Sequence, residues 1–535
     1  MTAVEPRSAS ERAGMEQSGN GPRSVSRVWI LDIAFGALVL VVATARFLIL
    51  RDGGAPATID NGNWVAFGDA IFGGDVRSPT IVYPPLIPIL AKASAMAFGL
   101  ISGTATLGAV SSAAPAVGFY VAMRRTGLGA VILPGAILVL GAGAVGEAAA
   151  WGGFPQLIGL GLAPLIFVEV DRWCTTGRRR SVWRLGLLFM VLFATTHFVA
   201  VAVATASVAM LLMGLPRMIR QHRPWRAWAT DALIIALPSA WLLPLYASLF
   251  GAFAGSAGDF RFLNQLSWSN LLGRIEFIYR DFPHLWRVAL PLTVLTPLLF
   301  AGRRSSTVWR ILVAVLVSVA LLTAVTREGR FLYFATLAVA LALTLWFETL
   351  SESRWLVGEP DTSDRLRGLV LKWALPLAAL AIAAWQIVAG LQLFHDQRDF
   401  YGVLTPGLYQ SLERIHIESA EDAIVAVASL RDAPLGWWVE AVTERETYYA
   451  SALRWLAFED EHRRARIGTE IFTRDFPNTE TLASAREHGI DYLIIPTRWA
   501  FYDDTLLGPE SELGRSALFR RDDVVVLSVA HATIP

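Results

Sequence analysis

The sequence predicts an α-helical polytopic membrane protein with a soluble α/β domain at its C-terminal end. Hydrophobic residues make up 54% of the 535 residues and charged residues only 17%, whereas soluble domains contain about 25% charged residues. Residues 28–392 consist mostly of long apolar runs, and a run of about 18 or more such residues is long enough to cross a bilayer as a helix. Residues 393–535 have the mixed composition of a soluble domain.

The polar N-terminal segment, residues 1–27, is rich in serine, glycine and arginine and has no apolar face. Such a composition cannot bury enough apolar surface to fold, so we expect a disordered cytoplasmic tail. The apolar run that follows ends in FLILRDGG and has no small-residue cleavage site. We therefore expect an uncleaved first span at the start of a membrane domain over residues 28–392.

The membrane spans are predicted from the apolar runs between charged breaks. The small residues inside these runs (glycine, alanine and serine) favour close packing between helices. The candidate segments lie near 29–50, 83–100, 104–123, 128–146, 153–171, 184–214, 229–250, 286–301, 307–325, 331–348 and 370–392.

The orientation follows from the loops that are rich in arginine, because short loops of this kind stay in the cytoplasm. Placing every arginine cluster on one side requires residues 184–214 to enter the membrane and return, with a tip at Thr195–Phe198. It also requires residues 83–100 to form a re-entrant or interface-lying helix. We expect about eleven spans in a bacterial cytoplasmic membrane, with the N-terminus inside and residues 393–535 outside.

The first outer loop contains a candidate catalytic acid, Asp60, about ten residues after the first span. Apolar residues then recur at helical spacing, which predicts a short amphipathic helix on the membrane surface. Pro84 and Pro85 open the next apolar helix, where the first turn tolerates their missing N–H donors. The residues with this helical spacing are Ala66, Phe67, Ala70 and Ile71.

This loop resembles the corresponding loop of GT-C-type polytopic membrane glycosyltransferases, most closely the aminoarabinose transferases and protein O-mannosyltransferases. In that family an acid at the start of the loop is followed by an amphipathic helix, a turn and a Pro-Pro-Leu helix start. Asn61 stands where the family pattern has a second acid, which is a departure. The matching residues are Asp60, Trp64, Ala66, Gly74-Asp75 and Pro84-Pro85-Leu86.

The resemblance implies that Asp60 deprotonates or orients an acceptor hydroxyl or amine. The acceptor then attacks the anomeric carbon of a sugar carried on a polyprenyl phosphate, with inversion. The residues alone also allow Asp60 to be an N-cap of the following helix. A second acid near the next outer turn is implied as well, and Glu147 matches it by position. Glu147 would bind the acceptor or a divalent metal, or it is an interface carboxylate in contact with water.

Three basic side chains are candidates for the donor phosphate. His197 lies at the tip where the family has a Thr-Lys-Gly sequence that meets the lipid phosphate, and the alternative is a satisfied interface histidine. Arg327 and Arg330 lie at the outer end of a predicted span, and a planar guanidinium suits phosphate. The alternatives for the two arginines are an ion pair with Glu328 and snorkelling. Arg46 inside the first span is expected to snorkel.

Several other site classes are excluded by the sequence. No nucleotide-binding glycine loop, zinc-spaced His/Cys cluster or Ser-His-Asp order is present. No basic stripe with interleaved aromatic residues points to nucleic acid. Beyond the divalent metal ion that the resemblance allows, we predict no cofactor.

The C-terminal domain alternates buried strands with charged helices, which predicts a small α/β fold. The predicted strands are residues 424–429, 492–496 and 524–529. The aromatic run Trp437-Trp438-Val439-Glu440 departs from the Trp-Trp-Asp motif of oligosaccharyltransferases, which are also GT-C enzymes. We expect these aromatic residues to pack against the membrane domain rather than to stack on a sugar.

These features together predict a membrane glycosyltransferase that uses a polyprenyl-phosphate-linked sugar. Its acceptor would be a glycan, lipid or protein of the cell envelope. The alternative is a non-catalytic membrane protein, either a transporter or a scaffold for envelope glycan assembly. A transporter is expected to have charged or broken helices near the bilayer midplane and repeated spans, and the sequence shows neither clearly.

Overall fold

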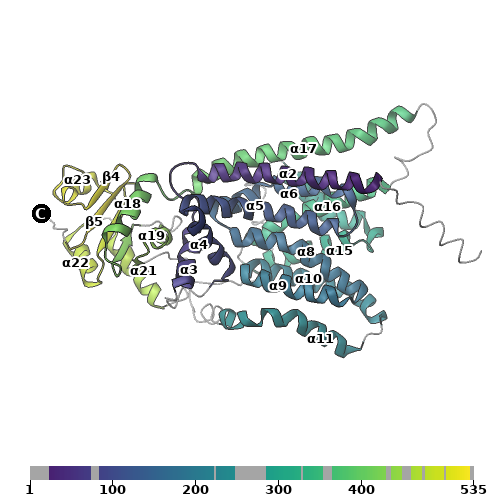
Figure 1. Cartoon of the computed structure of the whole chain (residues 1–535), viewed down its shortest axis with the longest axis horizontal. Helices are drawn as coiled ribbons and strands as arrows, with labels where there is room; N and C mark the ends of the chain where they lie inside the picture. Colours follow the sequence, from purple (N-terminus) through teal and green to yellow (C-terminus); the bar gives the residue numbers. More distant parts are fainter. Residues whose placement is uncertain are drawn as a thin grey trace, which may run out of the picture.

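The computed structural model combines a long helical bundle with a small α/β domain at one end (Figure 1). The predicted N-terminal tail falls mostly outside the described residues, and so does Arg327. The described residues are 23–73, 83–221, 224–247, 285–326, 329–352, 364–428, 435–448, 459–472, 476–498 and 502–530.

The helices of the membrane region follow the predicted apolar segments closely. They are α2 (Arg23–Arg51), α3 (Asn61–Gly73), α4 (Leu86–Phe98), α5 (Leu100–Arg124), η2 (Gly129–Ile132), α6 (Leu133–Leu140), α7 (Gly143–Trp151), α8 (Phe154–Thr176), α9 (Arg179–Thr195), α10 (His197–Arg220), α11 (Trp225–Ala236), η3 (Leu237–Leu242), α14 (Leu285–Leu299), η4 (Ala301–Arg303), α15 (Thr307–Val325), η5 (Gly329–Tyr333), α16 (Phe334–Glu352) and α17 (Asp364–Tyr401).

Seven helical segments in the described part of the chain are long and apolar enough to cross a membrane. The pair α6 and α7, bent by 43°, adds an eighth if it forms one broken span. The multi-pass membrane fold is therefore confirmed. The seven segments are Trp29–Arg51, Leu100–Arg124, Phe154–Thr176, His197–Arg220, Trp225–Ala247, Thr307–Val325 and Arg330–Leu350.

Two unusual segments have the form that the arginine distribution predicts. Helix α4 has only 13 residues, and at about 1.5 Å per residue it is too short to cross a bilayer core of about 30 Å. The segment 184–214 is divided into α9 and α10, which meet at the extended residue Thr196. Both helices continue beyond the predicted apolar run, to Arg179 and Arg220.

Arginine side chains from α8, α9, α15 and the end of α5 pair with buried acids of α8. The carboxylate of Glu169 is fully buried and lies within 4.0 Å of Arg125, Arg172 and Arg184. Asp171 nearby accepts two hydrogen bonds from Arg310, at 2.6 and 2.8 Å. These pairs fix the loop ends of α5, α8, α9 and α15 to one another.

Arg46 is buried, so the expectation that it snorkels is wrong. Only 1% of its surface is exposed, and its guanidinium donates to the carbonyls of Ser112 (3.1 Å) and Leu140 (2.7 Å). Leu140 ends α6, and the break before α7 leaves carbonyls without partners inside the helix. Gln386 of α17 donates to the next carbonyl, that of Gly141, at 3.2 Å. Arg46 and Gln386 therefore supply hydrogen-bond donors to the backbone carbonyls at the helix break.

The C-terminal domain contains a five-stranded mixed sheet in the order β2-β1-β3-β5-β4. Strand β1 is parallel to β2 and β3, and β5 is antiparallel to β3 and β4. The three predicted strands are confirmed as β1, β3 and β5. The elements are α18 (Pro406–Glu418), β1 (Ile424–Val427), α19 (Gly436–Thr443), β2 (Glu446–Thr447), α21 (Glu459–Ile471), α22 (Thr479–Glu487), β3 (Tyr492–Pro496), α23 (Asp504–Leu507), α24 (Glu512–Arg515), β4 (Phe519–Arg521) and β5 (Val524–Ser528).

Helix α19 docks this domain onto α3, at the end of the bundle where α3 and α4 lie (Figure 1). Trp438 is fully buried and packs in one core with residues of α3. Trp437 is also buried. The aromatic pair therefore packs against the membrane domain, as predicted. The boundary expected at residue 392 lies inside α17, which continues to Tyr401.

The crossing of α5 and α8 depends on glycine. A methyl group at Gly118 would lie 1.8 Å from the carbonyl oxygen of Gly161. The two backbones are therefore in contact.

Replacing Gly118 by alanine is expected to destabilise the bundle, because α8 must move to admit the methyl group. Overpacking of this kind costs roughly 1–3 kcal/mol, so the apparent melting temperature of the detergent-purified protein should fall. Gly36→Ala is the matched control, since no atom lies within 4 Å of that added methyl group. Equal effects of the two substitutions would contradict the packing role of Gly118.

Candidate functional site

The predicted site residues Asp60, Glu147, His197 and Arg330 gather at the end of the bundle that carries the C-terminal domain. They come from the loop before α3, from α7, from the start of α10 and from η5. Aromatic side chains contact Glu147, His197 and Arg330. Arg327, the fifth predicted residue, lies outside the described residues.

The backbone of Asp60 is held by the turn between α7 and α8. Its N–H donates to the carbonyl of Trp151 at 3.0 Å, and the indole N–H of Trp64 donates to the carbonyl of Gly152 at 2.8 Å. Gly152 has a left-handed φ of 95°, and a methyl group there would lie 3.0 Å from Cβ of Asp60. Glycine therefore permits the close approach of the turn to Asp60.

The side chain of Thr58 accepts a hydrogen bond from the start of α3. The N–H of Asn61 donates to the Thr58 hydroxyl at 3.3 Å, and the Asn61 amide donates to Thr104 at 2.6 Å. Within the described ranges, the Asp60 carboxylate has no capping hydrogen bond from α3. The capping contact at the start of α3 is therefore made by the Thr58 hydroxyl.

Two opposing effects set the pKa of Asp60. Burial raises the pKa to about 7, because a charged carboxylate is poorly solvated there, while the positive charge of Arg330 lowers it. A carboxyl whose pKa lies near the working pH is well suited to accept a proton in a reaction. Perturbed carboxyls of this kind concentrate at functional sites.

The guanidinium of Arg330 lies against two aromatic rings. Its central carbon is 5.4 Å from the ring centre of Trp151 and 5.0 Å from that of Phe198, which are cation–π distances. Its charge acts on both Asp60 and His197. Arg330 is thus the cation shared by the Asp60 loop and the start of α10.

The start of α10 adds polar groups beside Arg330. Thr196 precedes the helix, and its side chain makes no capping hydrogen bond. The Thr196 hydroxyl and Nδ1 of His197 are buried and have no hydrogen-bond partner in the part of the chain that is described. The exposed N–H groups of a helix start favour anions. The ring of His197 lies 5.3 Å from that of Tyr83, which lies 4.5 Å from that of Trp64.

Glu147 of α7 contacts the end of α17. Its carboxylate accepts a hydrogen bond from the hydroxyl of Tyr401, at 3.2 Å. The indole N–H of Trp151 donates to the hydroxyl of Tyr333 at 3.2 Å, and Tyr333 interacts electrostatically with Glu147. Across the described ranges, no three His, Cys, Asp or Glu side chains are grouped so that they could hold a metal ion.

Sequence reasoning missed the residues that hold these candidates in place. Thr58, Tyr333 and Tyr401 carry no motif that marks them. Trp438 was noticed only as part of an aromatic run, whereas its indole N–H donates to the carbonyl of Thr58 at 3.0 Å. This contact joins positions 380 residues apart, and no local pattern encodes it.

The sequence matches no protein-family model and no curated protein. Its fold is similar to that of ArnT from Cupriavidus metallidurans in the apo state, with a TM-score of 0.58, 13% identity, and coverage of 96% of this chain and 100% of that chain. The same protein bound to undecaprenyl phosphate gives a TM-score of 0.53 at 13% identity, over 95% and 99% of the two chains. The chain therefore shares the fold of ArnT, and the α-helical polytopic membrane fold with a C-terminal α/β domain that the sequence predicts is confirmed.

The titration of Asp60 should be visible in the pH dependence of stability. The folded protein holds its proton up to about pH 7, whereas an unfolded chain loses it near pH 4. Wild type should therefore lose stability relative to Asp60→Asn as the pH rises from about 4 to about 7, by at most about 1.4 kcal/mol for each pH unit. Above that range the difference should stay constant. Thermal unfolding of both proteins in detergent at several pH values measures it.

Asp503→Asn provides the control for this experiment. Asp503 lies at the surface, and its hydrogen bond with Thr505 lowers its pKa below the usual range of a carboxyl. The difference between wild type and this variant should not change between pH 5 and pH 7. A flat profile for Asp60→Asn over the same interval would show that the Asp60 carboxyl is not perturbed.

Proposed function

We propose that this chain is a GT-C-type membrane glycosyltransferase. It moves a sugar from a polyprenyl-phosphate donor to a glycan, lipid or protein acceptor of the cell envelope, on the extracytoplasmic face and with inversion. One observation carries the proposal: the carboxyl of Asp60 lies close enough to Arg330 to feel its positive charge, at the end of a bundle with the fold of ArnT. ArnT has been crystallised with bound undecaprenyl phosphate, which supports a polyprenyl-phosphate-linked donor.

The orientation is supported by the charge distribution. The start of α2 lies at the arginine-rich end, because Asp32 pairs there with Arg124 at 3.1 Å. Arginine-rich loops favour the cytoplasmic side, which supports an N-terminus inside the cell. The opposite end, with Asp60 and the C-terminal domain, then lies outside the membrane. Nucleotide sugars are not at hand there, and a lipid-linked sugar is the natural donor.

In the proposed reaction Asp60 is the general base. Its carboxylate takes the proton of an acceptor hydroxyl or amine, and the freed electron pair attacks the anomeric carbon of the sugar. The bond from that carbon to the phosphate oxygen breaks, and the polyprenyl phosphate leaves with the electron pair. Because attack and departure occur on opposite faces, the anomeric centre inverts.

Arg330 and His197 are proposed to hold the donor phosphate, and Arg327 remains a proposed member of the same group. Negative charge grows on the phosphate oxygen as the bond breaks, so a preorganised cation and helix N–H groups stabilise the transition state. The guanidinium of Arg330 is kept in place by Trp151 and Phe198. Glu147 is proposed to orient the acceptor or to contribute to a metal site.

The alternative, a non-catalytic transporter or scaffold, has one feature in its favour. Transporters contain broken helices and charges inside the membrane, and α6–α7 is broken close to the buried Arg46. Arg46 donates to the Leu140 carbonyl at that break and to the Ser112 carbonyl of α5. Arg46 therefore has a structural explanation, and we prefer the enzyme.

Asp60→Asn is expected to abolish transfer, because the amide cannot accept the proton. Loss of a positioned general base typically lowers the rate by about 10²–10⁴-fold. The variant should leave the envelope glycans and glycolipids of a deletion strain unrestored, as followed by mass spectrometry. Asp52→Asn, an exposed acid in the same loop, should complement like wild type. Full complementation by Asp60→Asn would rule out the general-base assignment.

Arg330→Gln is expected to weaken binding of undecaprenyl phosphate by about tenfold or more, because a hydrogen bond to a charged group contributes about 1.5–3 kcal/mol. Native mass spectrometry of the purified protein with added undecaprenyl phosphate measures this. Arg51→Gln is the control, since Arg51 is an exposed arginine at the end of α2. Equal affinity in the Arg330 variant and wild type would contradict the phosphate assignment.

A further inference from the structure

The backbone next to Asp60 is strained. Thr58 has a left-handed φ of 79°, and it is fully buried. A β-branched residue rarely adopts this conformation, because its Cβ crowds the backbone. Such a residue persists only where its surroundings hold it. The contacts that hold Thr58 therefore also determine where Asp60 lies.

Part of that hold comes from the C-terminal domain. The indole N–H of Trp438 donates to the carbonyl of Thr58 at 3.0 Å. A methyl group added to Gly62 would lie 2.7 Å from the Trp438 ring, so the ring sits directly against the first turn of α3. Asp60 lies between these two contact points in the sequence.

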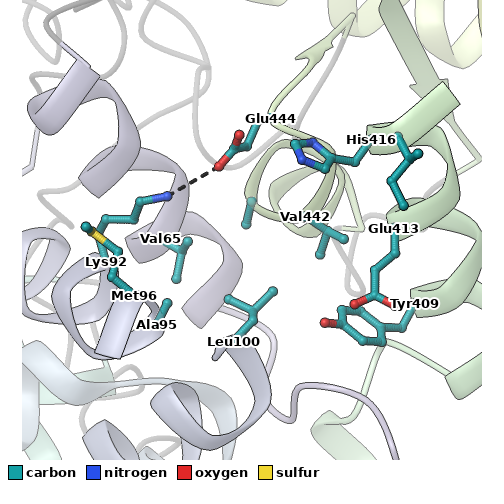
Figure 2. Close-up of a pocket in the computed structure, with 12 residues that line it drawn as sticks. Val65, Lys92, Ala95, Met96, Leu100, Tyr409, Glu413, His416, Val442 and Glu444 are labelled. Carbon is teal, nitrogen blue, oxygen red and sulfur yellow. Dashed lines mark hydrogen bonds and ion pairs between the residues drawn. The ribbon is translucent and has the colours of Figure 1, made fainter. Parts of the chain in front are cut away.

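The C-terminal end of α19 is attached to α4, which is itself linked to α3. Glu444 ends α19 in a left-handed conformation and pairs with Lys92 of α4 at 3.4 Å (Figure 2). Lys92 also pairs with Asp69 of α3. A cavity of about 470 Å³ separates Val442 from Leu100 of α5. On its membrane-domain side, α19 is held by its contacts with α3 and by the ion pair with Lys92.

We propose that Trp438 is a positioning residue for Asp60, and that α19 is a clamp through which the soluble domain sets the geometry of the membrane-side catalytic loop. The catalytic consequence rests on the proposed function, whereas the clamp itself does not. A misplacement of about 1 Å in a reacting group lowers rates by as much as 10²-fold. The soluble domain is thus needed for the chemistry as well as for any recognition of the acceptor.

Trp438→Phe tests the clamp, because it removes the N–H donor and keeps an aromatic ring. Trp437→Phe is the matched control: Nε1 of Trp437 is buried but has no hydrogen-bond partner in the described part of the chain. Hydrogen–deuterium exchange of the purified full-length protein in detergent is the readout. We expect the amides of residues 58–64 to exchange about tenfold faster in Trp438→Phe only. The amides of β3 and β5 should stay protected in both variants, which shows that the domain is folded.

The same variants are then compared in the envelope glycan assay. Trp438→Phe should lower product formation about ten- to a hundredfold, and Trp437→Phe should not. Adding Thr58→Asn to Trp438→Phe should restore part of the product, because asparagine adopts a left-handed φ more readily than threonine and keeps a side-chain acceptor for Asn61.

The outcomes separate the two proposals. Unchanged exchange at residues 58–64 in Trp438→Phe, or an equal increase in Trp437→Phe, would overturn the clamp whatever the reaction is. Faster exchange in Trp438→Phe together with full product, while Asp60→Asn is inactive, would overturn the positioning role. If Asp60→Asn itself is fully active, the general-base assignment fails and the positioning role fails with it, while the exchange data alone support or refute the clamp.

Discussion

Backbone groups inside a membrane must find hydrogen-bond partners within the protein, and the part of this protein that carries Asp60 depends on that constraint. The break between α6 and α7 leaves carbonyls that no helix satisfies, and Arg46 and Gln386 supply the donors. With these carbonyls paired, the chain can bend by 43° and place Trp151 and Gly152 beside the first outer loop. Those two residues then accept the hydrogen bonds of Asp60 and Trp64. A buried cation deep in the bundle thus supports the geometry of the surface loop.

The electrostatics of Asp60 show why both burial and a cation are present. For the proposed role of Asp60 as a base, burial alone would keep the carboxyl protonated at neutral pH, and a cation alone would lower its pKa and make it a weaker base. The two effects leave the pKa of Asp60 near neutrality. The rings of Trp151 and Phe198 attract the Arg330 guanidinium without cancelling its charge. The same cation can therefore act on the carboxyl and on an incoming anion.

Much of the fold was predictable, because apolar run length and arginine placement reflect the bilayer directly. The break at Thr196 followed from positive charges at both ends of one apolar run, and the strands of the C-terminal domain followed from short buried β-branched runs. The site was predictable only in part. Asp60 and Arg330 could be picked out by position, but the φ angle of Thr58 and the partners of Arg46 depend on contacts between distant segments. Residue-by-residue patterns do not contain that information.

The hydrogen bond between Trp438 and Thr58 also has a consequence for biosynthesis. The two residues are 380 positions apart, and the chain folds from its N-terminus as it is made. Thr58 therefore leaves the ribosome long before its partner exists. The loop gains its last contact only when residues 436–443 have been translated and carried to the same side of the membrane. A nascent or prematurely terminated chain holds its spans but lacks this contact, so completion of the site is coupled to completion of the polypeptide.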